Sequence, residues 1–352
     1  MFNLESIVRP NVLKMKPYSS ARDEFKGTAT VFIDANENNL GSLAGKNYNR
    51  YPDPHQRKLK ERIAEIKSVL PNQIFLGNGS DEAIDLLLRL FCRPGQDALL
   101  SFPPTYGMYE VSANLNEVRI DEVQLTADDF QIPVEKVLQN IKPETKIIFI
   151  CSPNNPTGNS INAKSIEAVL RGFEGVVVID EAYIDFAESP SWTNRLKEFP
   201  NLVVLQTFSK AWGMAGLRLG LAFASVEIIS LLDKIKPPYN INESTQELAL
   251  AALEKSEELK FMIEEILQER ELLTKALPTL YAVIEVYPSD ANFILVKVKD
   301  AQEMYNYLLE KGIVVRNRSS VPGCQNCLRI SVGTLEENQQ LIQAMTNFPI
   351  QD

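Results

Sequence analysis

The chain has 352 residues, of which 45% are hydrophobic and 23% charged, a composition typical of soluble globular proteins rather than disordered ones. Its formal net charge of -10 argues against nucleic acid or an anionic membrane as the main partner. Residues 1–10 carry Glu5 and Arg9 without a continuous apolar core, and no apolar run approaches the ~20 residues of a membrane helix. We therefore expect a cytoplasmic protein with no signal peptide.

Between residues 72 and 224, short apolar runs alternate with longer amphipathic segments. The runs are nearly continuous rather than alternating, which is typical of strands buried on both faces, and hence of a mostly parallel sheet covered by helices. They span residues 74–76, 98–100, 147–150, 176–179, 203–205 and 219–223. The segments 81–90 and 163–170 have the apolar spacing of helices. This pattern predicts an α/β domain.

The rest of the chain predicts a second, smaller domain. Residues 242–276 contain no Gly or Pro and indicate one long helix, ended by Pro278, that could join the two domains. Strand-like runs follow at 283–286, 293–298, 314–316 and 328–332, with helical segments at 301–311 and from 335 onward. We expect an N-terminal segment (1–45) packed with the small domain, a large domain (46–245) and a small α+β domain (246–352).

Four cysteines offer little for a metal site. Cys324 and Cys327 have the CxxC spacing of zinc and redox sites, but Cys92 and Cys151 lie far away in apolar runs and His55 is the only histidine. A closed tetrahedral site needs four ligands, and this chain has no second pair. The pattern favours two free thiols beside a turn over a metal site, with a redox role as the remaining alternative.

Polar motifs follow three of the predicted strands, and in such a sheet ligands bind beyond the carboxyl ends of the strands. Residues 77–82 (Gly-Asn-Gly-Ser-Asp-Glu) open a helix whose free N–H groups could bind an anion, although a turn capped by Ser80 has the same pattern. Tyr106 follows the next strand and suits stacking on a flat ring, but ordinary packing is the simpler explanation. The loop 152–158 is stiffened by two prolines, so that its amides project rigidly.

Two charged residues follow apolar runs, where an unpaired charge is costly. Asp180 could meet a protonated ring nitrogen, or it could cap the next helix. The amine of Lys210, if partly desolvated, could attack a carbonyl to form a Schiff base. Ser209 and Arg218 offer a hydroxyl and a cation to a phosphate, whereas a solvated lysine and a surface ion pair are the plain alternative. Pyridoxal phosphate enzymes need such a lysine and such an acid.

The combination of these motifs resembles the fold-type I pyridoxal phosphate aminotransferases. The motifs are Asn-Asn-Pro-Thr-Gly at 154–158, Asp-Glu-Ala-Tyr at 180–183, Ser209-Lys210, and Gly-Leu-Arg-Leu-Gly at 216–220. Within that class, residues 34–38, 50–54, 77–82 and 328–334 are similar to the histidinol-phosphate aminotransferase family, and Asn39-Leu40 departs from its pattern. The resemblance implies a large domain with a mostly parallel seven-stranded sheet, plus a small α+β domain.

The resemblance also implies roles for individual residues. Catalysis would involve Lys210, Asp180 and Tyr183. Pyridoxal 5'-phosphate would be bound by Ser80, Asp81, Tyr106, Asn155, Asp180, Tyr183, Ser209, Lys210 and Arg218, with Tyr51 contributed by the other subunit of a homodimer. The substrate's anionic end would meet Arg329, with Arg316, Tyr18 and Asn36 as neighbours, and no metal is implied.

The reaction implied is transamination of L-histidinol phosphate with 2-oxoglutarate, which gives imidazole acetol phosphate and L-glutamate in histidine biosynthesis. One arginine can chelate either a phosphate or a carboxylate, so a single site could accept both substrates. An aromatic aminotransferase or a threonine-phosphate decarboxylase of the same fold would keep nearly every cofactor residue. A non-catalytic binding or regulatory protein would be favoured by loss of Lys210 or Asp180, and both are present.

Overall fold

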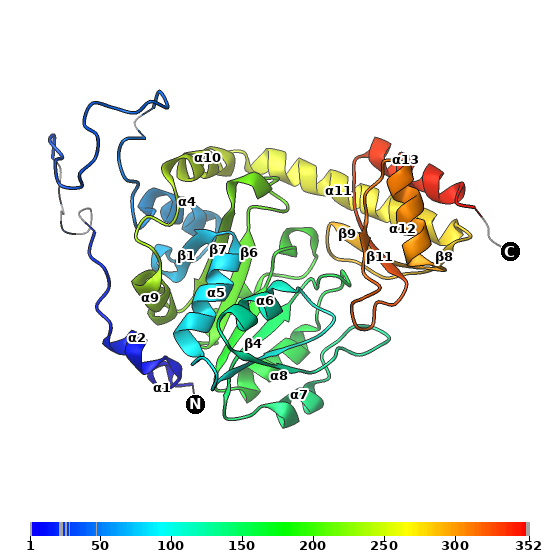
Figure 1. Ribbon diagram of the computed structural model, residues 1–352, viewed down its shortest axis with the longest axis horizontal. Coiled ribbons are helices and arrows are strands. Elements are labelled where there is room, and N and C mark those ends of the chain that lie inside the picture. Colours follow the sequence, from blue (N-terminus) through cyan, green and yellow to red (C-terminus); the bar gives the residue numbers. More distant parts are fainter. Residues whose placement is uncertain (1, 21–23, 25–26, 28, 47, 350–352) are drawn as a thin grey trace.

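A large α/β lobe and a smaller α+β lobe are joined by the long helix α11 (Ser256–Ala276), as Figure 1 shows. The computed structural model describes residues 2–20, 24, 27, 29–46 and 48–349. No helix in these ranges is long and apolar enough to cross a membrane. Each lobe is built around its own β-sheet.

The large lobe is built on a seven-stranded sheet in the order β1-β7-β6-β5-β4-β2-β3. Its strands are β1 (Ile74–Asn78), β2 (Ala98–Ser101), β3 (Arg119–Glu122), β4 (Thr145–Cys151), β5 (Val176–Asp180), β6 (Leu202–Thr207) and β7 (Leu219–Ala224). Only β7 runs antiparallel to its neighbours, which confirms the mostly parallel sheet. The sequence pattern missed β3 because its residues, Arg-Ile-Asp-Glu, include one apolar side chain. An edge strand has one sheet neighbour and needs less apolar surface.

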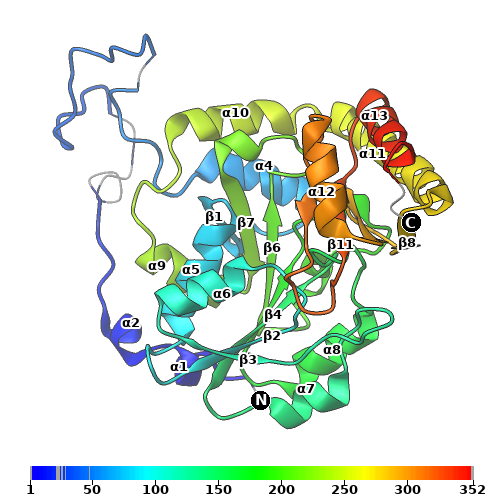
Figure 2. The ribbon, with the colours of Figure 1, turned by 45° about the vertical axis from the view of Figure 1, so that its right-hand side comes forward.

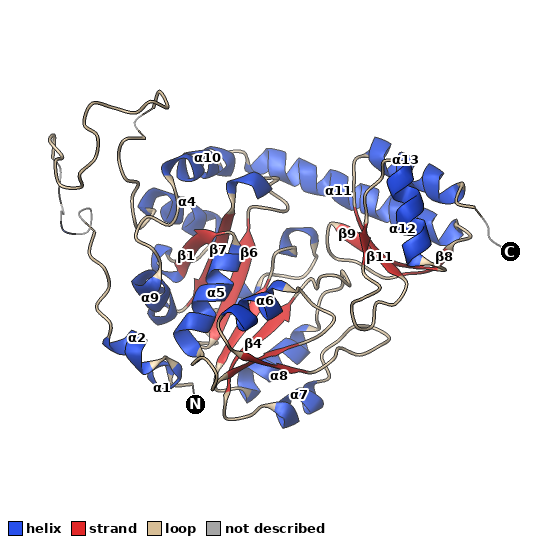
Figure 3. Ribbon diagram, in the orientation of Figure 1, coloured by secondary structure: helices blue, strands red, loops and turns tan. Residues whose placement is uncertain are grey.

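Helices cover both faces of this sheet (Figure 3). They are α4 (Arg57–Lys67), α5 (Ser80–Phe91), α6 (Met108–Leu115), α7 (Val134–Asn140), α8 (Ala163–Gly172), α9 (Val226–Ile235) and α10 (Glu243–Leu253). Successive residues of β5 point to opposite faces, so Val177 belongs to the core under α4, α8 and α10, and Val178 to the core under α5 and α9. Burial on both faces explains why the strand sequences are continuously apolar.

The small lobe is a four-stranded antiparallel sheet in the order β10-β11-β9-β8. Its elements are β8 (Val283–Val286), β9 (Phe293–Val298), α12 (Ala301–Glu310), β10 (Arg316–Asn317), β11 (Cys327–Ser331) and α13 (Leu335–Thr346). The predicted α+β unit is confirmed, although β10 begins only at Arg316. In Figure 2 the lobe stands beside the ends of the large sheet's strands.

The single helix predicted over 242–276 is wrong, because the chain forms two helices. α10 ends at Leu253 and α11 begins at Ser256, while Lys255 between them leaves the helical conformation with φ -108° and ψ 36°. The two helices on either side of the break pack against different cores. Ala249 and Leu253 of α10 join the large-lobe core, whereas Leu273 of α11 joins the small-lobe core. Apolar spacing along the sequence does not reveal such a change of partner.

The beginning of the N-terminal segment packs against the large lobe, not against the small domain as predicted. The segment contains the short helices α1 (Leu4–Ile7) and α2 (Pro10–Lys14). Val8 and Val12 are buried in the core beneath α5 and α9, and the Arg9 amide donates to the carbonyl of Leu90 at 2.9 Å. Figure 1 shows the described residues beyond α2 on the side of the molecule opposite the small lobe. The correction has a simple cause, since apolar residues in this segment indicate burial but not the surface that buries them.

Candidate active site

A cavity of about 500 Å³ opens between the lobes, at the carboxyl ends of the large sheet's strands. The large lobe lines it with Ser80, Asp81, Tyr106, Asn155, Asp180, Tyr183, Ser209, Lys210 and Arg218. The small lobe adds Arg316, Arg318, Val321 and Arg329. Residues more than 240 positions apart in the sequence therefore meet here, including eleven of the site residues that the sequence suggested.

Asp180 and Lys210 lie at the ends of neighbouring strands. Asp180 is the last residue of β5 and is buried, and its carboxylate accepts hydrogen bonds from the Tyr109 hydroxyl at 2.7 Å and the Ala182 amide at 3.1 Å. Burial raises the pKa of Asp180 to about 6, although both hydrogen bonds act in the opposite direction. Partial burial and then the charge of Arg329 lower the pKa of Lys210, which favours its neutral, nucleophilic amine.

Asn155 connects the two lobes across the cavity. Its amide nitrogen donates to the Tyr183 hydroxyl at 3.2 Å, and its amide oxygen accepts from Arg329 at 2.6 Å. The loop that carries Asn155 is held by its neighbour Asn154, whose amide donates to the Pro104 carbonyl at 2.8 Å and the Thr157 hydroxyl at 2.7 Å. The side chains of Asn155 and Tyr183 therefore have fixed positions beside the Lys210 amine, which lies 5.5 Å from the Tyr183 ring centre.

The opposite end of the cavity is formed where α5 begins. Gly79 precedes this helix with φ +74°, and a Cβ atom there would lie 2.6 Å from the Arg218 guanidinium. Gly220 of β7 passes so near the same turn that a Cβ atom would lie 2.1 Å from the Ser80 amide nitrogen. Glycine at both positions lets the helix N-terminus and Arg218 come together, which makes a cradle of free N–H groups beside a guanidinium. Arg218 pairs with Asp81 at 3.3 Å.

Three arginines from the small lobe form a second positive region. Arg316 and Arg329 are direct neighbours across β10 and β11, and Arg318 follows on the same segment as Arg316. None forms an ion pair with a described residue, and the Nε atoms of Arg318 and Arg329 are buried without a hydrogen-bond partner. Burial, and then the nearby positive charges, lower the pKa of Arg318. These guanidinium groups are suited to an anion bearing more than one negative charge.

Arg318 was not among the residues that the sequence indicated. The available signal was its two-residue spacing from Arg316, because alternate residues of an extended segment share a face. Tyr109 was also missed. It stands three positions after Tyr106, a spacing that places two side chains on one side of a helix turn. Both signals are common in proteins and become informative only beside Asp180 and Arg329.

Three predicted residues do not line this cavity within a single chain. Tyr51 is half exposed and stacks on Tyr239, with ring centres 4.5 Å apart. Tyr18 lies in a separate pocket beside His55 and Lys236, and Asn36 is exposed with φ 55°. The roles expected of these three residues therefore stay predictions.

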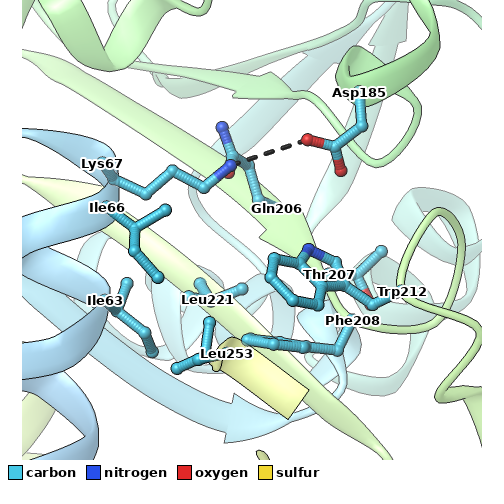
Figure 4. Close-up of a pocket in the computed structure, with 10 residues that line it drawn as sticks. All are labelled: Ile63, Ile66, Lys67, Asp185, Gln206, Thr207, Phe208, Trp212, Leu221 and Leu253. Carbon is cyan, nitrogen blue, oxygen red and sulfur yellow. Dashed lines mark ion pairs between the residues drawn. The ribbon is translucent and has the colours of Figure 1, made fainter. Parts of the chain in front are cut away.

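A small hollow behind the Lys210 segment is too small for a substrate. Its volume of about 10 Å³ would hold a water molecule, and in Figure 4 the Lys67 amine points at the Asp185 carboxylate, 3.6 Å away. It is lined by Ile63, Ile66, Lys67, Asp185, Gln206, Thr207, Phe208, Trp212, Leu221 and Leu253. These mostly apolar side chains support the back of β6 and the turn that presents Lys210.

The four cysteines are free and buried. Burial raises the pKa of Cys324 to about 12 and that of Cys327 to about 11, so both are protonated thiols near neutral pH. Among the described residues, no group of three or more His, Cys, Asp or Glu side chains is arranged to hold a metal ion.

The fold and the cavity together define a pyridoxal phosphate-dependent transferase. A buried carboxylate and a lysine of lowered pKa lie at the carboxyl end of a doubly wound sheet, opposite a helix N-terminus flanked by an arginine. Residues 18–345 match the family described as aminotransferase class I and II. The chain belongs to this family.

Three relatives of this chain are histidinol-phosphate aminotransferases. A histidinol-phosphate aminotransferase from Parabacteroides distasonis is 56% identical over 99% of this chain and 100% of its own. The crystal structure of the histidinol-phosphate aminotransferase from Clostridium acetobutylicum has a TM-score of 0.79 at 25% identity, over 85% of this chain and 90% of that one. The Sinorhizobium meliloti histidinol-phosphate aminotransferase, solved in complex with pyridoxal-5'-phosphate, has a TM-score of 0.78 at 24% identity, over 89% of each chain.

The residues of the cavity fit pyridoxal phosphate. Asp180 is buried without an ion-pair partner among the described residues, which suits it to face a protonated ring nitrogen. Gly79 leaves open the space beside Arg218 and the first turn of α5, where an anionic phosphate is stabilised. Lys210 supplies the amine that the cofactor's aldehyde requires. The ring nitrogen, the phosphate and the aldehyde of the cofactor therefore each have a matching group in this chain.

Proposed function

We propose that the protein transfers the amino group of L-histidinol phosphate to 2-oxoglutarate, giving imidazole acetol phosphate and L-glutamate. The observation that carries this proposal is the arginine cluster of Arg316, Arg318 and Arg329, which faces the Lys210 end of the cavity without a carboxylate partner among the described residues. A phosphate dianion on the substrate would supply the missing negative charge. The name of the 56% identical relative supports the same assignment.

Each remaining residue would have a definite task. When bound, pyridoxal phosphate would supply the carbonyl that takes up the amino group and a ring that accepts the electrons of the broken C–H bond. Lys210 would hold the cofactor and then move the proton of the substrate's α-carbon, for which its lowered pKa favours the neutral amine. Asp180 would keep the ring nitrogen protonated, and Asn155 and Tyr183 would orient the ring hydroxyl.

Ser80, Asp81, Ser209 and Arg218 would hold the cofactor's phosphate, and Tyr106 would pack on its ring. The phosphate cradle and the arginine cluster belong to different lobes, so the substrate's anion would not compete with the cofactor for Arg218. Glutamate would use the arginine cluster through its distal carboxylate, since one guanidinium can chelate either anion. One site could then serve both substrates in turn.

We further propose that two chains form a homodimer in the cytoplasm, with Tyr51 of one subunit completing the cofactor site of the other. Tyr51 lies outside its own cavity, although the family resemblance assigns it to the phosphate. The nearby segment also exposes large apolar residues: Ile33 is 80% exposed and Leu40 98%. Apolar side chains so exposed in one chain are suited to burial against a second.

A spectroscopic titration tests the proposed reaction. The purified protein, loaded with pyridoxal phosphate, is mixed with stoichiometric L-histidinol phosphate, and the absorbance of the cofactor's aldehyde form is followed while products are identified by mass spectrometry. We expect that absorbance to disappear with formation of imidazole acetol phosphate, and to return when 2-oxoglutarate is added. Carbon dioxide release instead would identify a decarboxylase, and a higher kcat/KM for phenylalanine an aromatic aminotransferase; either result would reject the proposal.

A further inference from the structure

Tyr109 lies directly behind the cavity without lining it. It projects from α6 into the large-lobe core and is 1% exposed. Its ring stacks on Phe149 of β4, with centroids 4.7 Å apart and planes 19° apart, and meets Tyr106 edge-on at 5.6 Å and 86°. Rings packed on two sides leave the hydroxyl a single direction, so its position is determined by the core.

That hydroxyl donates a hydrogen bond to Asp180 Oδ2 at 2.7 Å. The other carboxylate oxygen accepts from the Ala182 amide at 3.1 Å, so a donor holds each oxygen from a different element. The carboxylate cannot rotate without breaking one of the two bonds. Both donors also stabilise the charged form in a place where burial disfavours it.

The surroundings of Asp180 make the tyrosine's contribution unusually important. The titratable groups that face this carboxylate are Tyr109 from α6, Tyr106 just before that helix, Cys151 from β4, Asp81 from α5, Tyr183 shortly after β5 and Lys210 from the turn after β6. Asp81 and burial favour the protonated acid, while the Lys210 charge opposes them. Burial and Asp180 raise the pKa of Tyr109 well above 10, so its phenol keeps its proton near neutral pH.

We propose that Tyr109 is a positioning residue for the proposed reaction, holding Asp180 charged and correctly oriented toward the cofactor's ring nitrogen. The catalytic role inferred for Tyr109 rests on the proposed function. The hydrogen bond from Tyr109 and its effect on the charge of Asp180 do not depend on that function. Removal of the hydroxyl would leave the core ring in place and take one of the two donors from Asp180. An ordinary core tyrosine would instead contribute only its ring.

The test is Tyr109→Phe, with the cofactor-free protein and the loaded protein measured separately. In the cofactor-free protein, NMR of 13C-labelled aspartate follows the titration of Asp180, which is assigned by comparison with Asp180→Asn. We expect the midpoint to rise by about one pH unit or more, because the charged form loses a hydrogen bond. In the loaded protein, we expect the dissociation constant for pyridoxal phosphate to rise about tenfold and kcat to fall by a similar factor.

Two controls separate the hydroxyl from general packing. Tyr287→Phe removes a hydroxyl from a tyrosine of the small lobe that does not line the cavity, and it should leave both measurements unchanged. In the Asp180→Asn background, Tyr109→Phe should no longer weaken cofactor binding, because the charge it serves is absent. An equal loss of affinity in both backgrounds would mean that Tyr109 acts through packing, and the inference would fail.

A second variant keeps the test decisive if Tyr109→Phe does not fold. Replacement of Tyr109 by 3-fluorotyrosine preserves the ring and makes the phenol a stronger donor, so the Asp180 midpoint should move down. An unchanged midpoint with either variant would overturn the inference. A shifted midpoint in a protein that cannot transaminate L-histidinol phosphate would reject the proposed function and leave the inference about Asp180 intact.

Discussion

Asp180→Asn should stabilise the cofactor-free protein and weaken its binding of the cofactor. Asp180 is 2% exposed, and burial raises its pKa from 3.8 to about 6. The folded protein therefore holds a proton that the unfolded chain releases between these two pH values. The free energy of unfolding must fall as the pH rises through this window.

The size of the effect follows from the two pKa values. At about 1.36 kcal/mol per pH unit, the buried carboxylate costs about 3 kcal/mol at pH 8 and about half of that at pH 5. An amide side chain carries no charge and can still bond to Tyr109 and Ala182. The free energy of unfolding of Asp180→Asn should exceed that of the parent by up to about 3 kcal/mol at pH 8, with a smaller excess at pH 5.

Urea unfolding of both cofactor-free proteins at the two pH values measures this difference. Glu181→Gln is a matched control, because Glu181 is the next residue, is equally buried and has its pKa raised to about 7. Its carboxylate accepts from Ser191 and the Trp192 amide, and it does not line the cavity. It too should be stabilising at pH 8, but only Asp180→Asn should weaken cofactor binding, by about tenfold or more. An Asp180→Asn protein no more stable than the parent at pH 8 would refute the reasoning.

Three further predictions concern the cavity and the subunit contact. Lys210→Ala should leave a folded protein that binds pyridoxal phosphate without turnover; borohydride reduction and peptide mapping of the parent should find the cofactor on Lys210 and on no other lysine. Arg329→Ala should slow both half-reactions. Arg318→Gln should lower kcat/KM for L-histidinol phosphate about tenfold and that for glutamate less, because the third guanidinium matters most to a dianion. Single-turnover rates with each substrate measure the difference, and equal losses for the two substrates in Arg318→Gln would contradict this prediction. Mixing Tyr51→Ala with Lys210→Ala subunits should raise activity above that of Tyr51→Ala at equal Lys210 content, because one hybrid site is intact; hybrids seen by native mass spectrometry without rescue would exclude a shared site.

Local patterns in the sequence were sufficient for most of the framework. The continuous apolar runs predicted β1, β2, β4, β5, β6 and β7, because a strand covered on both faces needs apolar residues at every position. They failed at β3, whose outer edge faces no strand, and at residues 254–255, where a helical pattern continues through a change of packing partner. The burial of a segment can be predicted from its apolar residues, but the surface that buries it cannot.

The same distinction applies to the site. Lys210, Asp180 and Arg218 could be identified from the sequence because each stands in a motif whose residue types match a chemical task. Arg318 and Tyr109 have no such motif, and their importance depends on where the chain folds. Only tertiary structure places β5 beside β4 with α6 behind them, which brings the Tyr109 hydroxyl within 2.7 Å of Asp180.

The separation between sequence and structure is clearest at the two ends of the site. The turn at 77–82 could be predicted from the local sequence, because Gly79 and the start of α5 form the cradle from residues that are close together in the chain. The arginine cluster requires the small lobe to fold, β10 to pair with β11 and the lobe to close onto Asn155. Sequence alone determined which chemical groups this protein possesses; the tertiary structure decided which of them meet, because long-range contacts depend on the packing of whole elements.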